Sequence, residues 1–183
     1  MARLVILDRD GVINADSDRF VRSIAEWQPL PGSIDAIARL HKAGFVVTVA
    51  SNQSGVSRGL FTRETVYGMH RKLRRLVRAA GGEIAAIAFC PHHPDEGCRG
   101  RKPRTGLYTR LANDTGLPLD SAIVIGDSLR DLEAGDRVGA ELWLVRSGKG
   151  PRSLAQAADN PPDWWPRVQV ADDLAAVVSE VTA

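Results

Sequence analysis

Five short apolar runs along the chain predict the strands of a sheet. Residues 4–7 read Leu-Val-Ile-Leu without a polar position, a pattern typical of a strand that is covered on both faces. Similar runs occupy residues 45–50, 84–89, 122–125 and 141–145. Segments with helical spacing lie between these runs, so strands and helices alternate. The alternation predicts right-handed crossovers and an α/β fold, a three-layer doubly wound domain around a mostly parallel sheet.

Helical periodicity and capping residues predict the helices between the strands. The clearest period of about 3.6 residues follows Thr62, which is the expected cap of that helix. Ser128 is followed three residues later by Asp131, as in a capping box. Helices are expected after Ser33, Thr62 and Ser128. Another helix is marked by Leu107 and Leu111 and ends at Gly116, and a last one covers residues 172–181.

Composition and charge argue against a nucleic-acid-binding or membrane-spanning protein. The chain has 183 residues, of which 44% are hydrophobic and 25% are charged, and its formal net charge is +2. This net charge is too small to indicate a nucleic-acid-binding protein, and the basic run over residues 71–78 is more typical of a solvated helix face. No apolar window is long enough to cross a bilayer, and the N-terminus lacks a secretory pattern. We therefore expect a cytoplasmic protein without nucleic-acid or membrane partners.

The residues that follow the predicted strands form one chemical set. Asp8 and Asp10 follow the first strand, and Asp127 follows the fourth. Parallel strands place their carboxyl ends at the same edge of the sheet, where ligands bind in such folds. Three acids brought together repel one another without a cation, and carboxylate oxygens suit Mg²⁺. We expect Asp8, Asp10 and Asp127 to hold magnesium, with Asp131 in support.

Two further residues supply what phosphoryl transfer requires. Lys102 is a counter-charge for a phosphoryl group, and Ser51 can donate a hydrogen bond to its oxygens. A carboxylate can act as a covalent nucleophile, so Asp8 is expected to form an aspartyl-phosphate, with Asp10 as general acid and base. Singly, each residue has an ordinary interpretation, since acids and glycine suit turns and helix N-termini. Their order at successive strand ends favours the catalytic one.

This order resembles the four motifs of the haloacid dehalogenase (HAD) superfamily of phosphatases. The matching residues are Asp8-x-Asp10-Gly11, Ser51, Lys102 and Gly126-Asp127-x-x-x-Asp131. The resemblance implies a HAD-like fold, a magnesium-dependent phosphomonoesterase, and the residue roles given above.

Four longer stretches of sequence resemble one narrower family within this superfamily. Residues 7–14, 51–59, 90–94 and 101–103 resemble the D-glycero-D-manno-heptose-1,7-bisphosphate 7-phosphatases. This implies removal of the 7-phosphate of a heptose bisphosphate during the biosynthesis of nucleotide-activated heptose for lipopolysaccharide and other surface glycans. Histidinol phosphate or another small phosphomonoester is the alternative substrate, and an inactive phosphate- or nucleic-acid-binding module is the alternative from another class. Similar enzymes are often monomers, so a monomer is expected.

The spacing of the motifs bears on substrate access. The segments from Asp10 to Ser51 and from Ser51 to Lys102 each hold one predicted helix and one strand, which leaves no room for a separate cap domain. We expect residues 1–183 to be a single capless domain whose loops contact the phosphorylated sugar. The expected contact residues are Asp16, Arg19, Ser51, Asn52, Gln53, Ser54, Arg58, Arg101, Lys102 and Ser128.

A Cys/His loop lies between the third strand and the third motif. Related phosphatases often hold this loop with a structural zinc, bound by a C-x-H pair and a later C-x-C pair. This chain has Cys90, His92 and Cys98, but Gly100 stands where the fourth ligand would fall. A closed zinc site needs four ligands, and His93 is an awkward substitute beside His92. Two alternatives fit the sequence: a zinc site whose fourth ligand is water or His93, and a loop that binds no metal.

Overall fold

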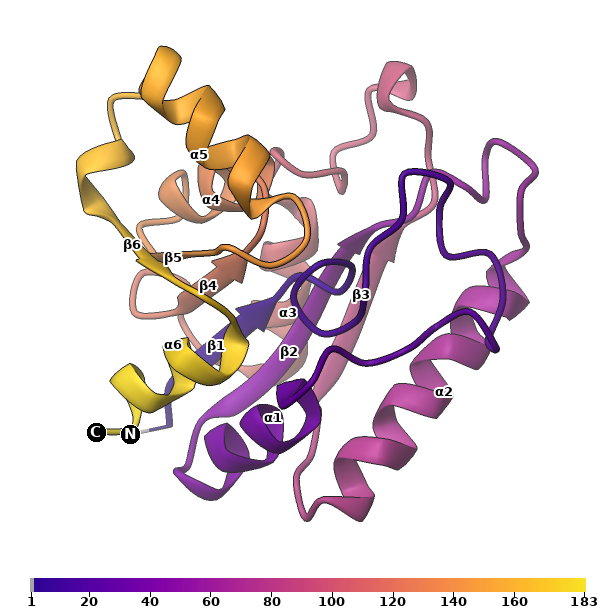
Figure 1. Cartoon of the computed structure of the whole chain (residues 1–183), viewed down its shortest axis with the longest axis horizontal. Coiled ribbons are helices and arrows are strands. Elements are labelled where there is room, and N and C mark those ends of the chain that lie inside the picture. The colour runs from indigo at the N-terminus through magenta and orange to yellow at the C-terminus, as the bar shows by residue number, and fades with distance from the viewer. Residues whose placement is uncertain (1) are drawn as a thin grey trace.

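The computed structural model describes residues 2–183, which form a six-stranded sheet with helices on both faces (Figure 1). The strands lie in the order β3-β2-β1-β4-β5-β6, and every neighbouring pair is parallel. Their bounds are Leu4–Leu7 (β1), Val46–Asn52 (β2), Ala86–Cys90 (β3), Ile123–Gly126 (β4), Glu141–Val145 (β5) and Val168–Ala171 (β6). The arrangement confirms the predicted three-layer α/β fold, with a sheet that is wholly parallel.

The helices form the two outer layers. One face of the sheet is covered by α1 (Ser33–Lys42), α2 (Arg63–Ala79) and α6 (Leu174–Val181), and the other by α3 (Gly106–Thr115), α4 (Leu129–Asp136) and α5 (Gly150–Asp159). Two short 3-10 helices, Pro94–Glu96 and Trp165–Arg167, precede α3 and β6. Within residues 2–183, no helix combines the length and apolar character needed to span a bilayer.

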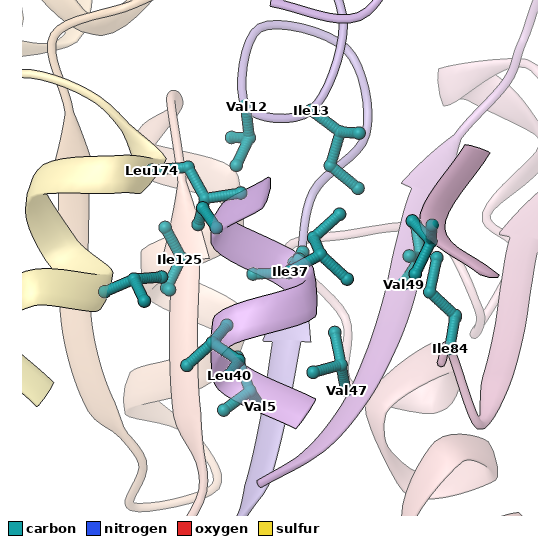
Figure 2. Close-up of a cluster of buried hydrophobic side chains, with 14 of the residues drawn as sticks. Val5, Val12, Ile13, Ile37, Leu40, Val47, Val49, Ile84, Ile125 and Leu174 are labelled. Atoms are coloured by element: carbon teal, nitrogen blue, oxygen red, sulfur yellow. The ribbon is translucent and has the colours of Figure 1, made fainter. Parts of the chain in front are cut away.

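Each strand contributes alternate side chains to two hydrophobic cores, one under each helical layer. Val5 and Leu7 of β1 belong to the core beneath α1, whereas Leu4 and Ile6 belong to the core beneath α3. Figure 2 shows the first core, in which α1, the strands and α6 bring together Val5, Ile37, Leu40, Val47, Val49, Ile125 and Leu174. Burial of each such side chain contributes roughly 1.5–3 kcal/mol. Strands buried on both faces, such as β1, are therefore apolar at nearly every position, which explains the apolar runs in the sequence.

Local hydrogen bonds decide where two of the helices begin. The Thr62 side chain accepts a hydrogen bond from Thr65 N at 3.2 Å and caps α2, as the sequence predicts. The predicted Ser33 cap of α1 is wrong, because Gly32, with φ 77°, holds the N-cap position. The Ser33 hydroxyl instead donates to Ile13 O at 2.6 Å. A contact with a distant loop has replaced the local cap.

The sequence pattern misses two elements near the C-terminus. β6 is an edge strand whose residues are half-buried or exposed, so it lacks the apolar run of the central strands. α5 begins at Gly150 followed by proline, which hides its start, although proline is well tolerated in the first turn of a helix. Both elements complete the β4-β5-β6 half of the sheet.

The strand order reverses between β1 and β4, and this junction positions the site. From β1 the chain proceeds outward through β2 and β3, whereas the second half proceeds outward from β4 on the other side. Asp8 follows β1, and its backbone N–H donates to Ile125 O of β4 at 2.9 Å. In open α/β sheets a crevice forms outside the carboxyl ends of the strands at such a switch point. Asp8 and Asp127 both lie at this crevice.

Candidate active site

Three carboxylates meet at the switch point of the sheet. Asp8, Asp127 and Asp131 each place an oxygen within 4.8 Å of an oxygen of the other two. Burial and the neighbouring Asp131 raise the pKa of Asp8 to about 6. Burial and the charge of Asp8 raise the pKa of Asp127 to about 8. Acids that resist ionisation in this way are stabilised by a bound cation, so the donor set fits a divalent metal.

Lys102 is the buried counter-charge of the cluster. Its Nζ lies 2.9 Å from Asp8 Oδ1, 2.6 Å from Asp131 Oδ1 and 2.7 Å from Ala50 O. Burial alone lowers the pKa of Lys102, but Asp131 and Asp8 outweigh it, so this pKa lies above its ordinary value. Asn52 fixes the backbone of Lys102 by donating to its carbonyl and accepting from its N–H, both at 3.1 Å. The ammonium group is therefore charged and held against Asp8.

Asp131 is bonded to protein through both carboxylate oxygens. Oδ1 faces Lys102, and Oδ2 accepts from the backbone N–H of Ser128 at 3.1 Å and from its hydroxyl at 2.8 Å. The predicted capping box at the start of α4 is confirmed. Because both oxygens are engaged, this geometry supports an indirect part for Asp131 in metal binding.

Two glycines make room for the Asp127 carboxylate. A Cβ atom on Gly11, which has φ +87°, would lie 2.0 Å from Asp127 Oδ2, and one on Gly148, with φ +56°, would lie 2.3 Å from the same atom. The backbone N–H of Lys149 donates to this oxygen at 2.8 Å. The Ser147 hydroxyl donates to Gly11 O at 2.7 Å and ties the loop after β5 to the loop after β1. Asp127 is thereby held by backbone from two loops.

The Asp10 carboxylate is held by other partners and is not part of the cluster of Asp8, Asp127 and Asp131. Its oxygens accept from the Arg9 guanidinium at 2.9–3.1 Å, from Asn14 Nδ2 at 2.8 Å and from Gln53 Nε2 at 2.8 Å. Burial raises the pKa of Asp10, but Arg9 and these hydrogen bonds outweigh it, so the pKa lies below its ordinary value. The prediction that Asp10 binds metal therefore concerns its backbone carbonyl rather than its side chain.

Gln53 links Asp10 to Ser51. Its Nε2 atom donates to Asp10 Oδ2 and also to Ser51 Oγ at 2.7 Å. Ser51 is only 1% exposed and does not line the catalytic cavity, whereas Gln53 does. Since Gln53 occupies an acceptor site of the Ser51 hydroxyl, the hydroxyl proton is free to donate elsewhere.

A cavity of about 310 Å³ opens above these residues. Of the predicted contact residues, the cavity is lined by Asp16, Asn52, Gln53, Ser54, Arg58, Arg101, Lys102 and Ser128. Arg19 lines a neighbouring hollow rather than this cavity, so its contact with the substrate stays a prediction. It lies beyond a turn in which its N–H donates to Ser17 Oγ at 3.1 Å, and its side chain is exposed.

The cations around the cavity fall into two groups. Lys149 lies 3.2 Å from Asp16, and Arg152 lies 3.9 Å from Asp18, so acids balance these charges. Three arginines that line the cavity form no ion pair with any residue in the described part of the chain: Arg58, Arg101 and Arg130. Burial and the charge of Arg130 lower the pKa of Arg101. Guanidinium groups that crowd one another without an acid indicate a site for an anion.

Comparisons with known proteins place this geometry in a family. A family model described as HAD-hydrolase-like matches residues 100–177. The D-glycero-beta-D-manno-heptose-1,7-bisphosphate 7-phosphatase of Pseudomonas putida is 47% identical over 179 residues, which cover 98% of this chain and 99% of that protein. The chain belongs to this family of HAD phosphatases. The enzyme of the same name from Neisseria meningitidis serogroup A is 47% identical over 172 residues, 94% of this chain and 90% of that one.

Solved structures of heptose bisphosphate phosphatases share the fold. The D,D-heptose 1,7-bisphosphate phosphatase of Bordetella bronchiseptica, crystallised with magnesium and phosphate, has a TM-score of 0.91 at 46% identity, covering 98% of this chain and 97% of that one. The enzyme from Burkholderia thailandensis has a TM-score of 0.75 at 39% identity and covers 99% of each chain. The likeness extends over the whole described fold.

The Cys/His loop gathers three potential zinc ligands. Cys90, His92 and Cys98 place ligand atoms within 4.8 Å of one another. The His93 ring does not join them, because its Nδ1 accepts from Asp95 N at 3.3 Å and caps the 3-10 helix Pro94–Glu96. His93 is therefore not the fourth ligand in this conformation. The three donors fit a zinc site with one coordination position left for a non-protein ligand.

Several residues of the site carry no signal that the sequence analysis used. Arg9 is fully buried beside Asp10 and contacts Met69, and Asn14, also buried, bonds to Asp10. Arg9 stands between the two acids of the first motif, and Asn14 lies in the stretch over residues 7–14 that resembles the narrower family, so their positions were an available signal. Lys149 follows β5 and donates its backbone N–H to Asp127, a contact that no side-chain pattern reveals. The other cavity residues that sequence reasoning missed include Phe20, Val21, Pro94, Arg130 and Arg152.

Proposed function

We propose that this chain hydrolyses the 7-phosphate of D-glycero-β-D-manno-heptose 1,7-bisphosphate through an aspartyl-phosphate on Asp8. The observation that carries the proposal is a nucleophile cluster and a group of unpaired arginines in one cavity. A substrate with two phosphates needs both features: the nucleophile cluster for the phosphate that reacts and the arginines for the phosphate at the far end. The names of the relatives that match the chain from end to end support this substrate.

Asp8 is suited to act as the nucleophile. Lys102 holds Asp8 Oδ1 at 2.9 Å, and Oδ2 accepts no hydrogen bond from residues 2–183. The free oxygen can therefore attack phosphorus while Lys102 holds the carboxylate in a fixed orientation. Charge on the transferring phosphoryl group would be met by Lys102 and by the Ser51 hydroxyl, whose orientation Gln53 sets.

Asp10 is suited to exchange protons with the leaving group and with water. Arg9, Asn14 and Gln53 hold its carboxylate beside the cavity. In the first step the leaving sugar oxygen would take a proton from Asp10. In the second step the same carboxylate would accept a proton from the water that attacks the aspartyl-phosphate. The low pKa that Arg9 imposes favours the second role, in which Asp10 is ionised.

The acid cluster fits Mg²⁺. Asp8, Asp127 and the backbone carbonyl of Asp10 would hold the ion, and Asp131 would support it through Lys102 and Ser128. When bound, magnesium supplies positive charge that keeps the carboxylates ionised and offsets the charge of the phosphoryl group. The raised pKa values of Asp8 and Asp127 support this proposal, since a cation would offset the burial and the mutual repulsion that raise them.

The unpaired arginines are suited to hold the phosphate at C1. Arg58 and Arg101 line the cavity with no acid partner, and both were expected from sequence to meet the substrate. Arg130 adds a third guanidinium to the cavity lining, close enough for its charge to act on Arg101. Phosphate is bound well by such planar groups, which can donate two parallel hydrogen bonds.

A substrate comparison tests the proposal. kcat/KM is measured with Mg²⁺ for D-glycero-β-D-manno-heptose 1,7-bisphosphate and for histidinol phosphate, which carries one phosphate and an amine. We expect the bisphosphate to be preferred by at least about tenfold, because a charge-assisted hydrogen bond to the second phosphate contributes roughly 1.5–3 kcal/mol. A preference for histidinol phosphate would overturn the proposed substrate while leaving the phosphatase chemistry in place.

We also propose that the Cys90-His92-Cys98 loop binds zinc through three protein ligands, with water in the fourth position. Gly100 N–H donates to Cys98 Sγ at 3.3 Å, and this hydrogen bond lowers the pKa of the Cys98 thiol although desolvation opposes it. A thiol that ionises readily is a better zinc ligand. Elemental analysis of active protein purified without chelator should find one zinc per chain, and its absence would refute the proposal.

The quaternary and cellular setting is a further proposal. We propose that the chain acts as a capless, single-domain monomer in the cytoplasm. The loops that line the cavity come from the same chain as the catalytic residues, which supports a site that is complete in one copy. Light scattering during size-exclusion chromatography should give the mass of one chain, and a dimer mass at assay concentration would contradict the monomer.

A further inference from the structure

Phe20 combines an unfavourable backbone conformation with a place at the mouth of the catalytic cavity. Its φ is 66°, the left-handed region that residues with a Cβ atom rarely adopt. A turn enforces this conformation, since Phe20 N–H donates to Ser17 O at 3.0 Å. Conformational strain of this kind clusters at sites where a side chain must be held in a particular place. The side chain that the strain directs here is an aromatic ring lining the cavity.

The ring of Phe20 lies beneath a cation. The guanidinium carbon of Arg58 is 5.8 Å from the ring centroid, within the range of a cation–π interaction. Arg58 is exposed and forms no ion pair in residues 2–183, and the ring of Phe20 is the aromatic group that its guanidinium faces. The other cavity-lining cations near this loop, Lys149 and Arg152, are paired with acids.

From this juxtaposition we infer that Phe20 is a positioning residue for substrate specificity. Its ring fixes the Arg58 guanidinium at the cavity wall, so that Arg58 meets the phosphate of the substrate farther from Asp8. The inference rests on the proposed function, because it requires a second phosphate. Fixing a long side chain before binding lowers the entropy lost when the substrate arrives. A ring also leaves the charge of Arg58 available to the phosphate, which an acidic partner would neutralise.

The apolar character of Phe20 alone does not account for these observations. At position 20, an aliphatic side chain could also give apolar cover, and a glycine would adopt φ 66° without strain. A partner acid could hold Arg58, as Asp18 does for Arg152. The aromatic ring is the feature that holds a cation without neutralising it.

A double-mutant cycle tests the inference. The variants are Phe20→Leu, which keeps apolar bulk and removes the ring, Phe20→Tyr, which keeps the ring, Arg58→Ala, and Phe20→Leu with Arg58→Ala. KM and kcat are measured with Mg²⁺ for heptose 1,7-bisphosphate and for p-nitrophenyl phosphate, which has no second phosphate. Thermal midpoints of all variants are compared, so that a change in folding is detected separately.

The expected results separate positioning from a structural role. Phe20→Leu should raise KM for the bisphosphate about two- to fivefold with kcat unchanged, the effect of losing an exposed cation–π contact. Phe20→Tyr should match the wild type, and the rise in KM caused by Phe20→Leu should be smaller on p-nitrophenyl phosphate than on the bisphosphate, because p-nitrophenyl phosphate lacks the phosphate that Arg58 meets. In the Arg58→Ala background, Phe20→Leu should cause no further change, because the ring acts through Arg58.

Three outcomes would overturn the inference. They are an unchanged KM in Phe20→Leu, an equal loss on both substrates, and a Phe20→Leu effect that persists without Arg58. Failure of the proposed function looks different, since the wild-type protein itself would then show no preference for the bisphosphate. That result would remove this inference together with the proposed substrate.

Discussion

Replacing Gly11 by alanine should disable the site by displacing Asp127 rather than by unfolding the protein. Gly11 has φ +87°, and an alanine Cβ would lie 2.0 Å from Asp127 Oδ2 and 3.1 Å from Gly148 Cα. Such contacts are not tolerated below about 3 Å, so the carboxylate must move by roughly 1 Å and would leave the N–H of Lys149. A displacement of this size at a reacting centre can cost on the order of 10²-fold in rate.

Gly44 provides the matched control for this substitution. It has φ +89°, almost the same backbone strain, and nothing lies within 4 Å of a Cβ atom built on it. Gly44→Ala should cost about 1 kcal/mol, a fall in Tm of about 2–4 °C, and leave kcat/KM unchanged. Gly11→Ala should lose about 10²-fold in kcat/KM and need more Mg²⁺ for half-maximal activity.

The assay compares both variants with the wild type across a Mg²⁺ titration, using p-nitrophenyl phosphate and the heptose bisphosphate, with Tm measured in parallel. Equal kcat/KM and equal Mg²⁺ demand in the two variants would refute the reasoning, because it would show that Asp127 does not need the space that Gly11 leaves.

Three further predictions concern charge and metal. Lys102→Met should abolish turnover and destabilise the metal-free protein by about 3 kcal/mol in urea unfolding, since it leaves Asp8 without its buried counter-charge; wild-type stability would contradict this. The folded-state pKa values of Asp8 and Asp127, about 6 and about 8, lie above the ordinary value of 3.8, so these groups favour the folded state at low pH. That stability is lost as pH rises from about 4 through 8, so the Tm of the metal-free protein should fall over this range. Added Mg²⁺ should raise the Tm more at high pH than at low pH. A Tm that depends on neither pH nor Mg²⁺ would count against the metal site. Gly100→Cys should increase zinc affinity at least tenfold in a chelator competition, because its Cβ would lie 3.6 Å from Cys98 Sγ, and an unchanged affinity would show that the loop is not a zinc site.

The sequence predicts the central part of the fold because its signals there are local and strong. Strands such as β1 are buried on both faces, so every position is apolar, and the Thr62 cap of α2 lies next to the helix that it stabilises. β6 is half-exposed at the edge of the sheet, and its pattern is weak for that reason. The Ser33 hydroxyl bonds to Ile13, a contact between segments twenty residues apart that no local pattern reveals.

The candidate site is predicted in part for the same reason. Parallel topology brings strand ends together, so reading the residues after each strand finds Asp8, Lys102 and Asp127, which the structure gathers in one place. Residues that act through tertiary contacts escape this procedure. Arg9 is buried because α2 lies across it, and Lys149 contributes a backbone N–H, for which no side-chain pattern exists.

The most direct test of the central claim is to detect the phosphoryl group on Asp8. In Asp10→Asn with p-nitrophenyl phosphate, whose leaving group needs little protonation, the aspartyl-phosphate should form while its hydrolysis is slow, because the general base is missing. Mass spectrometry after an acid quench should find the peptide that contains Asp8 heavier by one phosphoryl group, and Asp8→Asn should lack both this peptide and activity. Release of nitrophenol without a phosphorylated Asp8 peptide, or full activity in Asp8→Asn, would contradict the account.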